Sequence, residues 1–340
     1  MVVTVKDVAK LAGVSPSTVS RVCNNNPAIS PETRERVRRA MEELGYEPPV
    51  QQEAAQPIKN IGVILPPSRR DAYENTFYLK AIRGISQICN QRQVASTVIT
   101  GETYQEILST VQVLHRSGSI DGFILLYSRK NDIVLDYLCD KGILYVIVGK
   151  AGDLATQTVC VDNDNVLASQ EAANYLYNLG HRRIGFIGSS GGFLYSAERR
   201  SGWQVAALQQ GLQPRADYCI EMNGVQSGDS ELLEQLLRRE DRPTAFVVGD
   251  DMLALSLERC CTKLGLSIPE DLSVIAFNNS LYARMAAVPL TVVDINSYRL
   301  GQEAAVQLLR YAENPNLPAT RIMIPHRILE GCSCRSHIEK

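Results

Sequence analysis

Beyond residue 60 the chain alternates short apolar runs with segments of helical periodicity, and this alternation constrains its fold more than any other feature. The apolar runs predict strands at Ile61–Leu65, Gly122–Tyr127, Tyr145–Val148, Arg183–Gly188, Ala245–Gly249 and Leu272–Phe277. Helices are predicted between them, for example at Leu79–Arg92, Glu106–Ser117, Val166–Leu179 and Met252–Leu264. This repeat is typical of α/β folds with parallel sheets. Because about ten strands are many for one sheet, we expect two lobes.

The first 45 residues instead predict three short helices. Thr4 and Asp7 have the spacing of a capping box before the first helix, and Gly13 supplies the positive φ of the turn that follows it. Ser30 can cap the third helix, which Gly45 ends. Three such helices can bury one small core, as in a helix-turn-helix domain. The same periodicity also fits a bundle that docks on another protein.

The second of these helices, expected at Ser15–Val22, carries side chains suited to DNA. Its first helical position is Pro16, where a missing N–H costs nothing. Its outward face presents short polar side chains such as Thr18 together with Arg21, whose guanidinium can bond two acceptors on guanine. Residues 1–39 contain seven Lys or Arg against three Asp or Glu, although the net charge of the chain is −2. The basic surplus supports DNA contact in combination with this helix.

The sequence carries no sign of secretion, a membrane span or catalysis. We find no signal peptide and no run of roughly 18 apolar residues, so we expect a cytoplasmic chain whose nine cysteines stay reduced. Phosphate loops and nucleophile elbows are absent, and the four histidines are not spaced as metal ligands. Cys332, Cys334 and His337 lie in a short polar tail without a second cysteine pair. We therefore predict no enzyme activity, no cofactor and no metal site.

Polar and planar side chains follow several of the predicted strands. They form the pairs Tyr127 and Ser128, Asp162 and Asn163, Asp250 and Asp251, and Asn278 and Asn279. Ligands on parallel sheets bind beyond the carboxyl ends of the strands. Carboxylates and amides hold hydroxyl-rich ligands there, and an aromatic ring can pack against a sugar face. Each pair alone also fits a helix cap or a turn, so the prediction of a ligand site depends on the four pairs together.

The segment VTVKDVAKLAGVSPSTVSRVCNNNPAISPETRERVRRAMEELGYEP closely resembles the DNA-binding head of the lactose/purine-repressor family of bacterial regulators. The resemblance implies that the second helix enters the major groove of operator DNA, where base contacts specify the sequence and phosphate contacts position the protein. The implied contact residues are Thr4, Ser15, Pro16, Ser17, Thr18, Arg21 and Asn24. Pro16, Ser17, Thr18 and Arg21 are expected nearest the base edges, and Thr4 and Asn24 at phosphates.

A linker, expected at residues 48–60, separates this head (residues 1–47) from the rest of the chain. Its sequence PPVQQEAAQPIKN has no apolar period and contains three prolines. Members of the family usually carry a hinge helix here with an Ala-Arg-x-Leu motif, whose leucine wedges into the minor groove. That motif is absent, and Glu53, Ala54 and Ala55 lie nearest its place. We expect weaker bending of the operator than is usual in the family.

Residues 61–340 resemble the periplasmic-binding-protein-like (type I) sensor domain of the same family. The matching segments are HRRIGFIG, PEDLSVIAFNNS and PLTVVDIN. In that fold the chain crosses between two lobes three times. The resemblance implies an N-lobe of residues 61–161 and 294–321, a C-lobe of residues 162–293 and 322–340, and a ligand in the cleft between them.

The same resemblance implies which side chains meet the ligand. From the C-lobe these are Arg199, Asp250 and Asn278, and from the N-lobe they are Asn75, Phe77, Tyr127, Ser128 and Lys150. Asp162 is expected at a crossing between the lobes. Trp203, the only tryptophan, can stack on a sugar or anchor the core, since it lies one helical turn from Arg199.

The segments FILLYSR, VDNDN, FNNS and VDIN look most like the maltose-type repressors of Gram-positive bacteria. The resemblance implies a homodimeric repressor of carbohydrate-utilisation genes that binds double-stranded operator DNA and an α-glucoside-like sugar. A sugar sensor whose operator binding is weakened or lost is the alternative, because the linker is altered. A transport-type sugar-binding protein would need a signal peptide and would have no use for the head. An enzyme would need a general base or a phosphate loop.

Overall fold

The computed structural model describes residues 4–23, 30–46, 58–67, 75–152, 158–222 and 230–337. The chain divides into two compact units, Met1–Gln56 and Pro57–Lys340, which we call the head and the body. Asn24 and residues 48–57 of the expected linker lie outside the described residues. The expectation of an altered hinge therefore stays a prediction from the sequence.

The head contains three helices, α1 (Val5–Ala12), α2 (Pro16–Cys23) and α3 (Pro31–Leu44). The capping box that the sequence predicts is present. The backbone N–H of Thr4 donates to Asp7 Oδ2 at 2.9 Å, and the Thr4 hydroxyl donates to the same oxygen at 2.6 Å. These hydrogen bonds lower the pKa of Asp7. Val8, Val19 and Val37, one from each helix, are fully buried against one another in the small core of the head.

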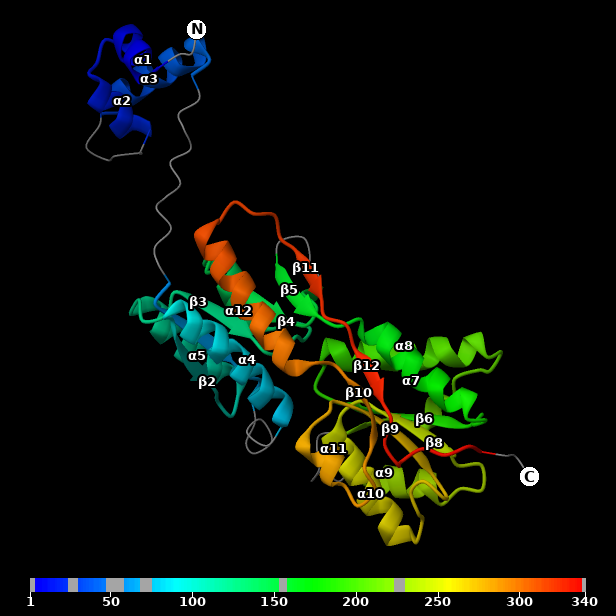
Figure 1. The fold of residues 1–340 in the computed structure, drawn as a ribbon. Helices are drawn as coiled ribbons and strands as arrows, with labels where there is room; N and C mark the ends of the chain where they lie inside the picture. The colour runs from blue at the N-terminus through cyan, green and yellow to red at the C-terminus, as the bar shows by residue number, and fades with distance from the viewer. Residues whose placement is uncertain are drawn as a thin grey trace. The chain divides into compact units, whose positions relative to one another are not determined.

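The N-lobe of the body is built on one six-stranded sheet with the strand order β11-β5-β4-β3-β1-β2, all parallel. Its strands are β1 (Asn60–Ile64), β2 (Ala95–Ile99), β3 (Gly122–Leu125), β4 (Tyr145–Val148), β5 (Val159–Asp162) and β11 (Arg321–Met323). Its helices are α4 (Thr76–Arg92), α5 (Tyr104–Arg116), α6 (Ile133–Asp140) and α12 (Ser297–Glu313). Helices α4 and α12 pack side by side on one face of this sheet (Figure 1), and α5 and α6 cover the other.

The C-lobe repeats this plan with the strand order β12-β10-β9-β8-β6-β7, in which only β12 is antiparallel to its neighbour. Its strands are β6 (Ile184–Ser189), β7 (Cys219–Met222), β8 (Ala245–Val248), β9 (Ser273–Phe277), β10 (Thr291–Asp294) and β12 (Arg327–Leu329). Its helices are α7 (Asn165–Asn178), α8 (Leu194–Gln209), α9 (Ser230–Leu237), α10 (Asp251–Leu264), α11 (Leu281–Met285) and the short 3₁₀ helix η2 (Ala216–Tyr218). The prediction of an α/β fold with two parallel-sheet lobes is confirmed.

The central strands of the sheets are apolar on both faces because helices cover both faces. In β1, Val63 belongs to the core under α4 and α12, whereas its neighbour Ile64 belongs to the core under α5 and α6. Ile124 and Leu125 of β3 divide in the same way. Full burial of each such side chain stabilises the fold by about 1.5–3 kcal/mol. Continuous apolar runs are therefore what this architecture requires, and they are what the sequence shows.

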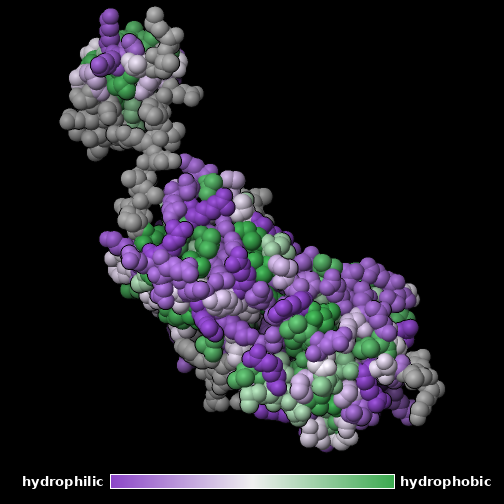
Figure 2. All heavy atoms as spheres, viewed as in Figure 1, coloured by the Kyte–Doolittle hydropathy of each residue, from purple (hydrophilic) through white to green (hydrophobic). Residues whose placement is uncertain are grey.

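Six of the described strands were not among those predicted from the apolar runs, namely β2, β5, β7, β10, β11 and β12. Strand β2 lies at the edge of its sheet. Only Ile99 of its five residues is buried, so the strand has no continuous apolar run. On the face drawn in Figure 2 the body is mainly hydrophilic, with scattered hydrophobic patches, as expected when both sheets are covered. Within the described ranges no helix is long and apolar enough to cross a membrane.

The three crossings between the lobes lie slightly further along the chain than the sequence predicts. Asp162 pairs with Met323 in the N-lobe sheet, so the first and third crossings follow these two residues and not residues 161 and 321. Asp294 pairs with Arg327 in the C-lobe sheet, so the second crossing follows Asp294. The observed boundaries differ from the expected ones by one or two residues, because backbone pairing extends past the apolar run onto Asp162 in β5 and Asp294 in β10.

Glycines let the helices of the N-lobe pack unusually closely. A Cβ atom added to Gly301 of α12 would lie 2.0 Å from the carbonyl oxygen of Ala81 in α4, and one added to Gly84 would lie 2.1 Å from that of Tyr298. Backbone therefore contacts backbone where these helices meet. Gly202 of α8 approaches the carbonyl oxygen of Val166 in the same manner in the C-lobe.

We expect Gly301→Ala to lower the free energy of unfolding of the body by about 1–3 kcal/mol, because the new methyl group overlaps backbone that cannot yield. This loss exceeds the roughly 1 kcal/mol by which helices favour alanine over glycine. Urea unfolding followed by circular dichroism measures the change, with Thr110→Ala on the exposed side of α5 as control. Equal stability of Gly301→Ala and the control contradicts the close approach of α4 and α12.

Candidate functional site

A cavity of about 60 Å³ lies between the lobes, at the edge where the parallel strands of both sheets end. This is several times the roughly 10–15 Å³ that one water molecule needs, so a small polar ligand has water to displace. Both lobes contribute to its wall, which is formed by Asn75, Phe77, Tyr78, Leu126, Tyr127, Ser128, Val148, Gly149, Lys150, Asp162, Asn163, Asn165, Tyr195, Glu198, Arg199, Asp250, Asn278, Ile295 and Leu300.

Asp250 is a buried carboxylate at the centre of this wall. Its Oδ1 caps α10 by accepting the N–H of Met252 at 2.8 Å, and its Oδ2 accepts the amide of Asn278 at 3.0 Å. The amide of Asn75, which caps α4 in the other lobe, reaches the same Oδ2 at 3.3 Å. Burial raises the pKa of Asp250. Oδ1 thus caps a helix of its own lobe, while Oδ2 accepts amides from both lobes, Asn278 on its own side and Asn75 across the cleft.

Arg199 supplies the buried positive charge of the cavity. Its Nε donates to Asn165 Oδ1 at 2.9 Å and its Nη1 to the carbonyl oxygen of Gly249 at 2.7 Å. The guanidinium lies over the ring of Phe277, 3.9 Å from the centroid, and over that of Tyr195 at 4.8 Å. Burial lowers the pKa of Arg199 to about 10, so the side chain stays charged at neutral pH. Its plane and its donors are fixed before any ligand arrives.

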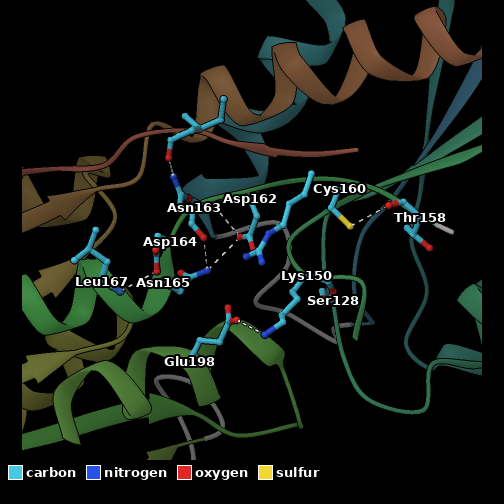
Figure 3. A network of polar contacts seen from close by, with 12 residues as sticks. Ser128, Lys150, Thr158, Cys160, Asp162, Asn163, Asp164, Asn165, Leu167 and Glu198 are labelled. Carbon is cyan, nitrogen blue, oxygen red and sulfur yellow. Dashed lines mark hydrogen bonds and ion pairs between the residues drawn. The ribbon is translucent and has the colours of Figure 1, made fainter. Parts of the chain in front are cut away.

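Polar contacts join the two lobes across the cleft. Lys150 of the N-lobe faces Glu198 of α8 (Figure 3), with 2.9 Å between Nζ and Oε1. The N–H of Leu194 donates to the carbonyl oxygen of Ser128 at 3.0 Å, and Lys80 donates to the carbonyl oxygen of Asn279. The Lys150 side chain is 43% exposed, so its ion pair contributes only about 0–1 kcal/mol. Such contacts can open and close at little cost.

The structure brings nine of the ten predicted ligand residues to the wall of this one cavity. They are Asn75, Phe77, Tyr127, Ser128, Lys150, Asp162, Arg199, Asp250 and Asn278. Their contact with a ligand stays a prediction. Several of them also cap helices or cross-link the lobes, so the two interpretations of the polar pairs, as caps and as ligand residues, are compatible.

Trp203 is the exception, and its assignment to the ligand site is corrected. Its side chain is 2% exposed, its Nε1 donates to the carbonyl oxygen of Ile184 at 3.2 Å, and its ring stacks on Phe186. Helix α8 starts near the cleft and runs back over the sheet. One turn beyond Arg199 the chain has therefore left the cavity for the core.

Sequence reasoning missed Tyr78, Asn165, Tyr195 and Glu198, which also line the cavity. Tyr195 lies four residues before Arg199 on α8, a spacing that places both on one helix face. Asn165 is the first residue of α7, and its Oδ1 accepts a hydrogen bond from Arg199 Nε. Tyr195 could have been found from its helical spacing to Arg199. Asn165 could not have been found without knowing that α7 and α8 meet at the cleft.

The predicted DNA contacts of the head are only partly described. Thr4, Ser15 and Pro16 are exposed, and Thr18 is half-buried. Ser15 Oγ caps α2 by accepting the N–H of Thr18 at 3.1 Å. The side chains of Ser17 and Arg21, like the whole of Asn24, lie outside the described residues. The DNA-binding assignments therefore stay predictions.

Burial raises the pKa of Asp162 from 3.8 to about 6, because the carboxylate is only 4% exposed. A carboxyl group with a raised pKa in the folded state contributes stability that is full below its unfolded pKa and is lost as the pH rises through the folded pKa. Between about pH 4 and about pH 7 we expect the free energy of unfolding of the natural chain to fall by about 2 kcal/mol relative to that of Asp162→Asn. Urea unfolding at a series of pH values measures this difference. A constant difference contradicts the raised pKa.

Known proteins share both units. Residues 4–49 match the lacI family of bacterial regulatory proteins, and residues 173–334 match a periplasmic binding protein-like domain. The chain is 33% identical to the HTH-type transcriptional regulator MalR of Streptococcus pneumoniae, over 97% of this chain and 100% of that protein.

Two solved structures agree with this assignment. A transcriptional regulator LacI from Bacillus cereus subsp. cytotoxis has 35% identity and a TM-score of 0.79, covering 83% of this chain and 100% of that one. The transcriptional regulator CelR in complex with cellobiose has 26% identity and a TM-score of 0.75, covering 98% of this chain and 100% of that one. The chain thus belongs to the lacI family of bacterial regulatory proteins and is a DNA-binding transcription regulator, not an enzyme.

Proposed function

We propose that the chain represses carbohydrate-utilisation genes by binding operator DNA through its head, under the control of an α-glucoside-like sugar in the cavity of its body. The observation that carries the sugar proposal is the buried set of Asp250, Asn278 and Arg199 at one cavity wall. A carboxylate, an amide and a guanidinium together accept and donate hydrogen bonds in fixed directions, which suits neighbouring hydroxyl groups. The aromatic rings of Phe77 and Tyr195 line the same cavity and can cover an apolar sugar face.

The relatives support a sugar as the class of ligand. CelR was solved with cellobiose, a disaccharide, and its structure spans this chain almost completely. The likeness of the VDNDN and FNNS segments to maltose-type repressors favours an α-glucoside over other sugars. Isothermal titration with maltose, other disaccharides and phosphosugars tests this step. Binding of none of the α-glucosides overturns it.

The proposed mechanism is a shift between two arrangements of the lobes. A sugar that binds one arrangement better than the other shifts the equilibrium between them. In a homodimer such a shift changes the spacing of two heads on a pseudo-palindromic operator. The alternative is a sugar sensor with weak or lost operator binding, favoured by the absence of the family's hinge motif.

We expect Asp250→Asn to weaken sugar binding by about ten- to a hundredfold, because a hydrogen bond to a charged group contributes about 1.5–3 kcal/mol. Asparagine is also a good helix cap, so α10 should keep its start. Trp203→Phe is the matched control. It should lower the stability of the C-lobe but change the sugar affinity by less than about twofold, because Trp203, unlike Asp250, does not line the cavity. Isothermal titration measures the sugar affinity of both variants. A larger loss of affinity in Trp203→Phe than in Asp250→Asn contradicts the assignment of Asp250 to the sugar site.

We expect Arg21→Ala to abolish the sequence preference of the head. A bidentate contact to guanine discriminates between bases by about 1–3 kcal/mol, or roughly five- to 150-fold. Arg38→Ala, which removes an equal charge from α3, should weaken binding to all DNA alike. The measurement is competition between a promoter fragment from the chain's own operon and random DNA at fixed salt. If both variants lower the two affinities in the same proportion, Arg21 does not read bases.

A further inference from the structure

Three segments carry the chain from one lobe to the other, directly after Asp162, Asp294 and Met323. Opening or closing of the cleft must bend all three. Two of them are tied by backbone, because the N–H of Ile324 donates to the carbonyl oxygen of Asp162 at 2.7 Å. If the segments bent independently, such hydrogen bonds would break. The way in which the segments are joined therefore decides how the lobes move.

One buried side chain joins all three segments. Asn163, 2% exposed, follows Asp162 in the first segment. Its Nδ2 donates to the carbonyl oxygen of Ile295 in the second segment at 3.1 Å and to that of Ile324 in the third at 2.7 Å. Both protons of the amide are used in this way. A carboxylate or a hydroxyl cannot replace them, because neither supplies two donors.

The same residue is connected to the cavity, where Asp162, Asn163 and Asn165 lie together (Figure 3). Asp162 Oδ1 accepts the N–H of Asn163 at 2.8 Å and the amide of Asn165 at 3.1 Å. Asn165 Oδ1 in turn accepts Arg199 Nε at 2.9 Å. A continuous series of hydrogen bonds therefore leads from the cavity arginine to the crossing segments.

We propose that Asn163 is a positioning residue that joins the three crossing segments into one hinge, so that they respond together when a ligand engages Arg199. The joining of the segments follows from the contacts of Asn163 alone, and the response to a ligand rests on the proposed function. Without the amide, two buried carbonyl oxygens in different segments lose their donor, while the cores of both lobes are untouched.

Hydrogen exchange of the intact chain tests the hinge without any ligand. The reporters are the hydrogen-bonded amides of Asn165, Asn296 and Ile324, one for each segment. In Asn163→Ser we expect all three to exchange faster by about tenfold, with the amides of β1 and β8 unchanged. Asn163→Asp is the second variant, in case serine admits a water molecule in place of the amide. Asn174→Ser in α7, outside the three segments, is the matched control.

The outcomes are decisive in either direction. Faster exchange confined to the three reporters supports the hinge. Faster exchange at Asn165 alone, faster exchange throughout both lobes, or rates equal to those of Asn174→Ser in both Asn163 variants overturn it.

A second measurement tests the response to ligand. Saturating maltose should change the operator dissociation constant of Asn163→Ser by a factor close to one, whichever the direction of its effect on the natural chain. A factor equal to that of the natural chain overturns the proposed response. If the natural chain itself binds no operator or no sugar, the proposed function fails, and hydrogen exchange still decides whether Asn163 joins the segments.

Discussion

The carboxyl end of each parallel strand is the constraint on which the rest of the body depends. The chain that leaves a strand there continues into a helix, and the first N–H groups of that helix need hydrogen-bond acceptors from outside it. Asn75 and Asp250 meet this need for α4 and α10, and both project into the same cavity. Because the two sheets present these ends to each other, the groups that start the helices also form the wall of a binding site. Stability of the lobes and recognition of a ligand therefore use the same side chains.

This dual use explains why the site could be predicted well from the sequence. Polar pairs after apolar runs can be recognised without a structure, and six of the eight residues in those pairs line one cavity. The other predicted residues of the wall, such as Arg199 and Asn75, came from the resemblance to the family and not from the pattern. The failures have a different cause. Trp203 depends on the direction in which α8 crosses the sheet, and Asn165 depends on which two helices meet. Strand β2 was missed because an edge strand is half exposed and loses its apolar pattern. Local periodicity in the sequence does not predict which distant segments pack against one another.

Several of the contacts that cross the cleft are polar and individually weak, which suits a switch. The bonds of Asn75 to Asp250 and of Leu194 to Ser128 each contribute about 0.5–1.5 kcal/mol net, and the exposed ion pair of Lys150 contributes less. A ligand of micromolar affinity contributes about 8 kcal/mol of binding free energy. A modest part of that energy, if it favours one arrangement of the lobes, is enough to reverse their equilibrium. The buried apolar side chains are far more costly to disturb than these contacts, so each lobe should keep its own fold when the cleft moves.

Control of operator affinity by the body is the central claim, and fluorescence anisotropy tests it directly. A labelled promoter fragment from the chain's own operon is titrated with the intact chain in the presence and absence of saturating maltose or another bound α-glucoside. Our account predicts that the sugar changes the operator dissociation constant by at least about fivefold, in either direction. An operator dissociation constant that is the same with and without every sugar that binds the body would contradict it.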